Sequence, residues 1–440
     1  MNRFDTRQLP FLTYQDAEEM IMTALPMYQR NGQAAMAKQD LSKIKKLLSY
    51  LGDPHLDFAA VHIAGTNGKG SVSHMLSAVF QSNGYQTGLF TSPHLKSYRE
   101  RIRIDGAMIE EEFVLKWVNT HGEYLIQNEF SFFEMSMGLA ASYFSEKNID
   151  IAVFETGLGG RLDATNVLKP SFTIITHIGP DHQAYLGNTL PEIAREKAGI
   201  IKESVPVLLG SNMDPELYPV FDEVAEARHA PVIRARADRW IPSGTRDDKT
   251  IFAWEGGSTS NGESLLLPSL APYQFYNINT VWYACEELRN RKILALEREK
   301  IIHGLEHFTR MTGFKGRYEI IHKDPMVILD TTHNVSGLEF YTPLFENKSV
   351  HLHLILALMK ERDVSEFLSR LPKNATYYFC QPDVPRALPA AELKREAEKL
   401  GMKGEVWAHP KEALKRLIVE ANEEDIGLIL GSIFLVAEIL

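Results

Sequence analysis

The segment Val61-His-Ile-Ala-Gly-Thr-Asn-Gly-Lys-Gly-Ser71 combines glycines, one lysine and one hydroxyl group in a short stretch. An apolar run over 58–63 enters this turn, and a helical pattern follows from Lys69. A strand that passes through glycines into a helix start directs backbone N–H groups and the positive end of the helix dipole at one point. Lys69 would add a mobile charge for the outer phosphates of a nucleotide, and Ser71 a hydroxyl near a bound metal ion. The predicted phosphate loop consists of Gly65, Thr66, Asn67, Gly68, Lys69, Gly70 and Ser71.

This loop departs from the commonest phosphate-binding pattern, which has a glycine five residues before the Gly-Lys pair and Ser or Thr directly after the lysine. Here Ile63 stands five residues before Gly68, and Gly70 separates Lys69 from Ser71. The alternative is a glycine-rich turn with a chance lysine. The strand pattern before the loop and the helix pattern after it favour the phosphate loop.

Two polar residues follow other apolar runs in a similar way. Glu155 ends the run 149–155 and precedes three glycines, and His182 follows the run 171–177. Ligands of parallel sheets bind at the carboxyl ends of strands, so both side chains are expected at one edge. Together they predict a divalent-ion site with oxygen and imidazole ligands. The structural alternatives are a capped turn for Glu155 and a packing role for the histidine.

Further polar residues stand at predicted strand ends. Ser92 follows the run 87–90 and offers a hydroxyl to the same edge, unless it only forms a turn before a proline. Asp330 ends the run 326–330, with Arg317 upstream of it. A carboxylate and an arginine at the front of a second domain suit a nucleotide held between two domains.

The elements that must position these residues alternate along the chain. Between the phosphate loop and residue 235, helical patterns separate short apolar runs, which predicts an α/β fold with a mostly parallel sheet covered on both faces. The expected strands are 87–90, 149–155, 171–177, 205–209 and 231–235. The expected helices are 110–127, 132–146 and 190–202. Residues 238–270, rich in Gly, Ser, Asp and Asn, predict a small β excursion.

A second domain is expected after the short basic segment 309–317, because the alternation of apolar runs and helical patterns restarts there. We therefore expect a P-loop NTPase-like, doubly wound ATP-binding domain over 1–308 and a linker over 309–317. Residues 318–440 should form a smaller Rossmann-like α/β domain.

Composition limits the function classes. A chain of 440 residues with a net charge of −10 has no basic field to hold nucleic acid, so anionic ligands need metal ions or local basic groups. Only two cysteines, Cys285 and Cys380, argue for a reducing compartment without a disulfide framework. No apolar run has the length of a signal peptide or a membrane span. We expect a cytoplasmic protein, with no membrane contact and with a monomer as the default.

Taken in order, several segments resemble the folylpolyglutamate synthase/dihydrofolate synthase family, within the wider group of ATP-dependent amide ligases that includes the muramyl-peptide ligases. They are GTNGKGS (65–71), TSPHL (91–95), SFFE (131–134), ETGLGGRLDATN (155–166), DHQAYLGNTLPEIAREKAGIIK (181–202), YQFYN (273–277), KGRYE (315–319) and DTTHN (330–334). The resemblance implies a ligase that adds L-glutamate to the carboxylate of a pterin substrate, either dihydropteroate, reduced folate polyglutamates or both. The reaction would pass through an acyl phosphate and release ADP and phosphate.

The resemblance also implies roles for single residues. The expected ligands of Mg²⁺, of which two ions are anticipated, are Ser92, Glu155, His182 and Lys197. Lys197 lies in a helical pattern that by itself would indicate a solvated lysine, but it matches a lysine that the family carries as a CO₂-derived carbamate. The expected ATP contacts beyond the phosphate loop are Asn277, Arg317, Asp330 and the neighbouring His333. The segments expected to line the pterin contain Phe133, Glu134, Leu162, Asp163 and Ala164. The residues expected to act in catalysis are Lys69, Glu155, His182, Lys197 and Arg317.

Some positions depart from the family pattern. Tyr273 stands where histidine is usual, Lys315 where proline is usual, and Thr331-Thr332 where Gly-Ala is usual. The lead into Asp-His at 177–180 differs as well. All of them flank the matched polar residues without replacing them, so the resemblance extends to the ligase class and not to a preference among pterins.

Two other readings remain. A muramyl-peptide ligase would carry a uridine-nucleotide domain before the phosphate loop, but only 64 residues precede Gly65. Its loop would also commonly read Lys-Thr-Thr rather than Lys-Gly-Ser. A non-catalytic ATP- and folate-binding paralogue is disfavoured because Glu155, His182 and Lys197 are all present.

Overall fold

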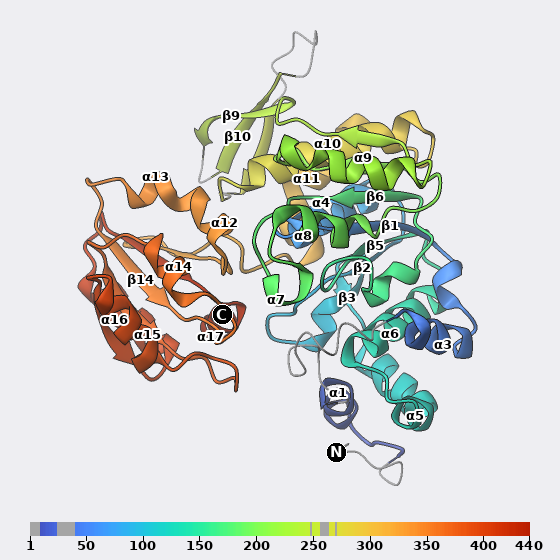
Figure 1. Ribbon diagram of the computed structural model, residues 1–440, viewed down its shortest axis with the longest axis horizontal. Coiled ribbons are helices and arrows are strands. Elements are labelled where there is room, and N and C mark those ends of the chain that lie inside the picture. The colour runs from blue at the N-terminus through green and yellow to red at the C-terminus, as the bar shows by residue number, and fades with distance from the viewer. Residues whose placement is uncertain (1–8, 24–39, 247–248, 256–263, 269–270) are drawn as a thin grey trace. The chain divides into compact units, whose positions relative to one another are not determined.

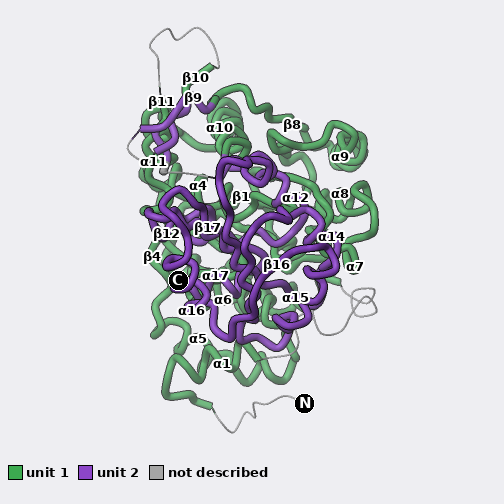
Figure 2. The backbone as a smooth tube through the Cα atoms, turned by 90° about the vertical axis from the view of Figure 1, so that its left-hand side faces the viewer, with its two compact units in different colours: residues 1–241, 253–265, 275–313 green, residues 242–252, 266–274, 314–440 purple. Residues whose placement is uncertain are grey.

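The computed structural model describes residues 9–23, 40–246, 249–255, 264–268 and 271–440. The chain divides into two compact units (Figure 2). The first unit comprises residues 1–241, 253–265 and 275–313, and the second comprises 242–252, 266–274 and 314–440. Each unit has its own sheet and its own apolar core.

The main sheet of the first unit contains eight strands among the described residues, in the order β4-β3-β2-β5-β1-β6-β7-β8. Their bounds are β1 (Ala59–Ala64), β2 (Thr87–Phe90), β3 (Ile102–Ile104), β4 (Ala107–Met108), β5 (Ile151–Glu155), β6 (Phe172–Ile175), β7 (Val207–Leu209) and β8 (Val232–Arg234). The six strands from β2 to β8 in this order are parallel, and β3 and β4 extend the sheet antiparallel at one edge. This confirms the predicted mostly parallel sheet.

The antiparallel edge was not expected from the sequence. Asp105 and Gly106, which join β3 to β4, both adopt positive φ angles of 47° and 82°. Two consecutive residues of this kind form the tight turn that matches the twist of a hairpin, and Asp-Gly is one of its preferred sequences. The short strands beside it were too brief to stand out by alternation.

Helices cover this sheet (Figure 1). The α-helices of the first unit are α1 (Tyr14–Thr23), α3 (Ser42–Tyr50), α4 (Lys69–Ser82), α5 (Glu111–Gln127), α6 (Phe132–Glu146), α7 (Gln183–Leu186), α8 (Leu190–Ala198), α9 (Tyr218–Glu226), α10 (Gln274–Asn290) and α11 (Arg298–Thr312). Strands β1, β2, β5, β6 and β7 are almost wholly buried, as expected when both faces of a parallel sheet are covered. Helix α11 packs closely on α4, since a Cβ at Gly304 would lie 2.6 Å from the Cα of Val79.

The predicted β excursion is a three-stranded sheet in the order β11-β10-β9, within the described residues. Its strands are β9 (Trp240–Arg246), β10 (Lys249–Trp254) and β11 (Ser264–Pro268). Residues 247–248, 256–263 and 269–270 of the predicted segment lie outside the described residues. Trp240 packs edge to face on both Trp254 and Trp282, which are tilted relative to each other. The guanidinium of Arg298 lies 4.1 Å from the ring centroid of Trp254.

The second unit is a smaller α/β layer structure, as predicted. Its six-stranded sheet, counted over the described residues, has the order β12-β13-β17-β14-β15-β16, and β12 alone among them is antiparallel. The strands are β12 (Glu319–His322), β13 (Met326–Leu329), β14 (Leu352–Leu356), β15 (Thr376–Cys380), β16 (Lys403–Trp407) and β17 (Ile426–Leu430). The helices are α12 (Val335–Leu338), α13 (Thr342–Phe345), α14 (Val364–Ser369), α15 (Ala390–Lys399), α16 (Pro410–Glu420) and α17 (Ile433–Ile439).

Two helix ends differ from the expected bounds. Helix α11 continues to Thr312, so the first residues of the expected linker are helical, and Gly313 ends the helix in the left-handed conformation at φ 65°. Helix α8 ends at Ala198 rather than near 202, with Gly199 at its C-cap. Glycine has a low helix propensity, so the helix ends before Gly199, and the expected helix over 190–202 was too long at its C-terminus.

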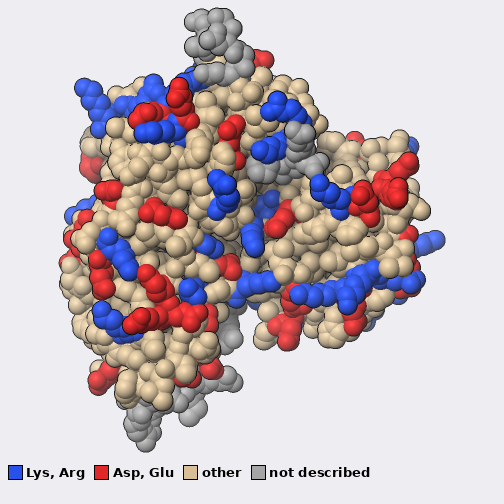
Figure 3. Space-filling model, turned by 180° about the vertical axis from the view of Figure 1, so that it is seen from behind, with Lys and Arg blue, Asp and Glu red and all other residues tan. Residues whose placement is uncertain are grey.

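Surface charge is mixed. Over most of the face shown in Figure 3, acidic and basic side chains alternate over short distances, in keeping with the small net charge per residue. Among the described residues, no helix is long and apolar enough to cross a membrane.

Candidate active site

The order of parallel strands in the first unit determines which loops become neighbours. In the sequence β2-β5-β1-β6, the carboxyl ends carry Ser92, Glu155, the phosphate loop and His182 respectively. Glu155 pairs in register with Ile63 of β1, only two residues before Gly65. Because parallel strands end at one edge of the sheet, the four predicted segments are brought to the same edge.

The neutral side chains of Thr176 and Asn277 pack against the phosphate loop. The hydroxyl of Thr176 donates to the carbonyl of Asn67 at 2.7 Å, and a Cβ at Gly65 would lie 1.9 Å from that hydroxyl. At Gly68, where φ is 88°, a Cβ would lie 2.5 Å from the side-chain oxygen of Asn277. Both glycines are therefore required by close approach as well as by conformation.

A second contact joins the loop to the segment that carries His182. The hydroxyl of Thr66 donates to the carbonyl of Gly179 at 3.1 Å and accepts from the N–H of the same residue at 3.1 Å. The N–H of Thr66 also donates to the carbonyl of His177. Three hydrogen bonds thus join the loops after β1 and β6.

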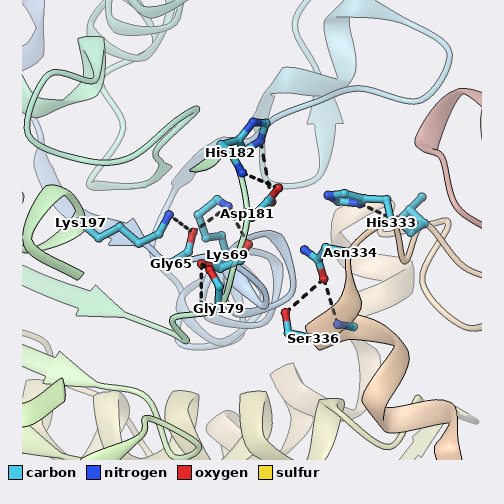
Figure 4. Close-up of polar contacts among 12 residues, drawn as sticks. Gly65, Lys69, Gly179, Asp181, His182, Lys197, His333, Asn334 and Ser336 are labelled. Atoms are coloured by element: carbon cyan, nitrogen blue, oxygen red, sulfur yellow. Dashed lines mark hydrogen bonds and ion pairs between the residues drawn. The ribbon is translucent and has the colours of Figure 1, made fainter. Parts of the chain in front are cut away.

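Two lysines converge on this loop (Figure 4). Lys69 Nζ donates to the carbonyls of Gly65 and Thr66 at 3.0 and 3.2 Å. Lys197 Nζ, from helix α8, donates to the same Gly65 carbonyl at 2.8 Å. Both nitrogens therefore lie next to the N-terminus of α4, where an anion is favoured, and Lys69 contributes a positive charge there.

Lys197 is buried, with 4% of its surface exposed. Burial is the main cause that lowers its pKa, to about 7, and the charge of Lys69 lowers it further. The carboxylates of Asp181 and Asp163 act in the opposite direction. Near neutral pH this amine is therefore partly uncharged, unlike the solvated lysine that its helical pattern would suggest.

Glu155 lies at the start of the same helix. Its side chain is 3% exposed and accepts a hydrogen bond from the N–H of Ser92 at 3.0 Å. A Cβ at Gly70 would stand 3.6 Å from Glu155 Oε2, so the carboxylate lies directly beside the first turn of α4. Ser92, Glu155 and the phosphate loop are therefore brought together, as the sequence predicted.

His182 begins helix α7 in a left-handed conformation, with φ at 50°. Its N–H donates to Asp181 Oδ1 at 2.9 Å, and its Nε2 lies 3.8 Å from Oδ2 of the same residue (Figure 4). No group of three or more His, Cys, Asp or Glu side chains that could hold a metal ion occurs in the part of the chain that the structure describes. An Mg²⁺ ion, which keeps several waters and uses few carboxylates together with phosphate oxygens, does not need such a group.

The residues expected to line the pterin divide into two kinds. The ring of Phe133 packs against Gly157, where an added Cβ would lie 2.6 Å from the ring. The ring centroids of Phe133 and Phe90 are 5.7 Å apart. Glu134 instead closes the N-terminus of α6, since its Oε2 accepts from the N–H of Ser131 at 2.8 Å. Glu134 thus orients the helix that carries Phe133.

The second predicted segment shows the same division. Asp163 is buried and accepts from the N–H groups of Gly157 and Leu158, both at 2.9 Å, and from the hydroxyl of Thr165 at 2.5 Å. Burial raises its pKa, while these hydrogen bonds lower it. Asp163 therefore holds the glycine loop after β5 in shape, with Leu162 partly exposed and Ala164 buried next to it.

In the second unit, Asp330 follows β13 and is 1% exposed. Its Oδ1 accepts from the N–H and the hydroxyl of Thr332, each at 2.8 Å, and its Oδ2 accepts from the hydroxyl of Tyr273 at 2.6 Å. Burial and the charge of Asp330 raise the pKa of Tyr273, whereas the positive charge of Arg317 lowers it. Arg317 is thereby near this pair.

The loop after Asp330 is ordered by its own side chains (Figure 4). His333 Nδ1 lies 2.8 Å from the carbonyl of Thr331. Asn334 caps helix α12, since its side-chain oxygen accepts from the N–H of Gly337 at 2.9 Å and from Ser336 at 3.2 Å.

Sequence reasoning did not single out Thr176 or Asp181. Thr176 supports the phosphate loop from below, and Asp181 is the carboxylate beside His182. The signal that could have found them is their place after β6: Thr176 directly follows the strand, and Asp181 lies in the loop beyond it, next to His182.

Comparisons with known proteins agree with this geometry. Residues 63–240 match the Mur ligase middle domain, and residues 316–433 match the Mur ligase glutamate ligase domain. A Bacillus subtilis dihydrofolate synthase/folylpolyglutamate synthase is 32% identical over 444 aligned residues, which cover 98% of this chain and 99% of that protein.

Solved structures show the same likeness. Escherichia coli FolC in complex with DHPP and ADP superposes with a TM-score of 0.80 at 25% identity, covering 97% of both chains. A folylpolyglutamate synthase from Thermotoga maritima gives a TM-score of 0.78 at 30% identity, covering 97% of this chain and 95% of that one. The chain therefore belongs to the folylpolyglutamate synthase/dihydrofolate synthase family of ATP-dependent ligases.

Proposed function

We propose that this chain, as a monomer, uses ATP to join L-glutamate to the carboxylate of a pterin substrate, either dihydropteroate, reduced folate polyglutamates or both. The observation that carries the proposal is the convergence of Lys69 and Lys197 on the Gly65 carbonyl, with the buried carboxylate of Glu155 beside the same helix start. This arrangement suits a nucleotide triphosphate and a divalent cation at one edge of a parallel sheet.

The chemistry requires activation of the acceptor. A carboxylate does not react with an amine at neutral pH, because the oxygen that must leave is a very poor leaving group. Attack of the carboxylate oxygen on the γ-phosphorus of ATP forms an acyl phosphate and releases ADP. The amine of glutamate then attacks the acyl carbon, loses a proton, and the C–O bond to phosphate breaks to leave an amide.

The residues of the first unit have distinct parts in this proposal. Lys69 and the N–H groups of the phosphate loop would bind and orient the phosphates. Ser92, Glu155, His182 and a modified Lys197 would hold Mg²⁺, two ions of which would neutralise charge between the γ-phosphate and the acceptor. The chain's net charge of −10 then does not prevent anion binding, because the positive charge is local.

Lys197 is proposed to carry a carbamate. Only an uncharged amine adds to CO₂, forming an N–C bond and releasing one proton, and the product is an anion that can bind metal. The low pKa of Lys197, about 7, supports this because it supplies uncharged amine near neutral pH. Its burial against Gly65 supports it also, since the group would form beside the phosphate loop.

The remaining residues are proposed to bind the organic parts of the substrates. Phe133, Leu162 and Ala164 would line the pterin, while Glu134 and Asp163 keep those two segments in shape. The proposed ATP contacts beyond the loop are Asn277, Arg317, Asp330 and His333. We propose residues 1–308 as the ATP-binding domain, 309–317 as the connection and 318–440 as the Rossmann-like domain.

The test is ADP release by the purified chain with ATP, Mg²⁺ and L-glutamate, supplied in turn with dihydropteroate and with tetrahydrofolate. Release that needs both glutamate and a pterin supports the proposal, and the faster of the two pterins identifies the preferred acceptor. ATP binding without pterin-dependent release would instead identify a non-catalytic paralogue.

A further inference from the structure

Arg101 is a buried cation with an incomplete set of partners. It ends the short helix η4 (Tyr98–Arg101), and 5% of its surface is exposed. Its Nε donates to His94 Nδ1 at 2.8 Å, and the guanidinium carbon lies 4.9 Å from the ring centroid of Phe132. Across the described residues, neither Nη1 nor Nη2 of Arg101 has a hydrogen-bond acceptor, and no carboxylate forms an ion pair with it.

Among the described residues, no neighbour hydrogen-bonds to the terminal amino groups of Arg101. Burial lowers the pKa of Arg101, and the charges of Glu155 and Glu100 only partly offset this effect. His94 accepts through Nδ1 and is uncharged, because burial and the charge of Arg101 lower its pKa to about 3. Phe132 offers only the negative face of its ring. The carboxylate of Glu100 is engaged by the backbone N–H groups of 95–97. A buried charge without a hydrogen-bonded partner of opposite sign is unfavourable, so the site is suited to an incoming anion.

Its position indicates which anion. The carbonyl of Arg101 accepts from the N–H of Thr91 at 3.0 Å, which places the residue next to Ser92 at the proposed metal edge. On its other side, Phe132 is the first residue of α6 and precedes 133–134, which we propose to contact or support the pterin. Arg101 thus lies between the proposed metal edge and the start of α6. Burial lowers the pKa of Arg101, and the nearby charge of Glu155 raises it.

We propose that the two terminal amino groups of Arg101 bind the acceptor carboxylate of the pterin substrate and orient it for attack on ATP. The assignment rests on the proposed function. The acceptor carboxylate is the one anionic group that must reach the phosphate loop while its pterin end stays near α6. A guanidinium offers parallel N–H groups that match both oxygens of a carboxylate, which an ammonium cannot do.

The test compares acids with their amides. Dissociation constants are measured by calorimetry, with Mg²⁺ and a non-hydrolysable ATP analogue present, for dihydropteroate and its carboxamide and for tetrahydrofolate and its γ-carboxamide. The proteins are the wild type, Arg101→Met, Arg101→Lys and the control Arg99→Met. Arg99 lies in the same short helix but pairs with the exposed Glu111 at 2.7 Å.

Wild type and Arg99→Met should bind the preferred acid about 10- to 100-fold more tightly than its amide, the range of a charge-assisted hydrogen-bonded pair. In Arg101→Met this ratio should fall to about one, while affinity for the ATP analogue is unchanged. The same acid-to-amide ratio in wild type and Arg101→Met, whatever its size, overturns the proposal.

Arg101→Lys covers the case in which Arg101→Met does not fold, as judged by its thermal transition. Lysine keeps the charge and the apolar stem but lacks the two parallel N–H groups of a guanidinium, so the acid-to-amide affinity ratio should still fall. An unchanged ratio in Arg101→Lys overturns the assignment. Failure of the proposed function is distinguishable, because wild-type protein would then show no pterin-dependent ADP release. A wild type that turns over while the ratios are unaffected refutes only the role of Arg101.

Discussion

Two buried carboxylates stand at the carboxyl ends of strands, Glu155 as the last residue of β5 in the first unit and Asp330 directly after β13 in the second, yet their surroundings differ. Glu155 lies beside Gly70 at the start of α4, next to the cationic phosphate loop. Asp330 is enclosed by three donors from Thr332 and Tyr273. The first is the one that we propose to hold a metal ion, whereas the hydrogen bonds of the second shape the loop that follows it. An identical sequence signal, a carboxylate after an apolar run, therefore supports two different roles.

The largest effect is expected when the charge of Glu155 is removed. Glu155→Gln should lower kcat by about 10³-fold or more, because the proposed metal-binding carboxylate is lost while the hydrogen bond from Ser92 can be kept. ADP release measured over a range of Mg²⁺ concentrations tests this. Asp330→Asn is the matched change and should lower kcat much less. Equal losses in the two variants would show that the two carboxylates do not differ in role.

Lys69→Ala tests the cationic side of the first edge. Loss of the charge that we propose to bind phosphate should lower kcat/KM for ATP by about 10²- to 10³-fold with the fold retained. The control is Lys46→Ala, which removes an exposed lysine whose ammonium donates to the Asn128 side chain, and it should leave turnover unchanged. Near-normal turnover of Lys69→Ala would exclude the phosphate loop from the mechanism.

Lys197→Ala should also lose activity, by about 10²-fold, because the proposed carbamate would be absent. Short carboxylic acids such as acetate or propionate should restore part of it by filling the space of the missing anionic group. The measurement is ADP release with and without the added acid. Full activity of the variant without any acid would refute a metal-binding role.

A smaller effect is expected at Tyr273 in the second unit. Tyr273→Phe leaves Asp330 Oδ2 without its donor and should lower the free energy of unfolding by about 1–3 kcal/mol. Tyr273→His, which restores the residue usual in the family, should recover part of it. Denaturant unfolding measures both, with Tyr85→Phe as a control whose hydroxyl is exposed. An unchanged free energy of unfolding in Tyr273→Phe would show that the Tyr273 hydroxyl does not stabilise Asp330.

The smallest effect is a pH dependence carried by His62 of β1. Burial lowers its pKa from 6.5 to about 3, and its Nε2 lies 2.8 Å from the hydroxyl of Thr165. Between these pH values the unfolded chain binds more protons, so stability falls as pH falls below 6.5 and is unaffected above it. The contribution should be about 1.4 kcal/mol at pH 5.5.

Comparing unfolding free energies at pH 7 and 5.5 tests this. His62→Gln should lose less stability between the two pH values than the wild type does. His353→Gln in the second unit should behave more like the wild type, because Asp425 partly offsets the effect of burial on the pKa of His353. The same pH loss in His62→Gln and in the wild type would contradict the prediction.

Sequence reasoning did well where the signal is local. The strand, glycine turn and helix start around Gly65 are contiguous, so their geometry follows from neighbouring residues. It did less well at Lys197, whose helical pattern indicates a solvated side chain. Helix α8 instead packs that side chain against the loop after β1, 132 positions away. Such long-range packing leaves no periodic trace in the chain.

By itself, the sequence determined the mostly parallel sheets, the phosphate loop and the edge at which polar residues gather, because alternating apolar runs and strand ends dictate these. Only the tertiary structure decided which charged side chains are buried and which groups hydrogen-bond to them. Tyr273 and Thr332 depart from the family pattern separately in sequence, yet both donate to Asp330. Arg101 became notable only once Phe132 and His94 enclosed it. The reason is physical: burial and hydrogen-bond partners set the energy of a charge, and folding brings those partners from distant positions.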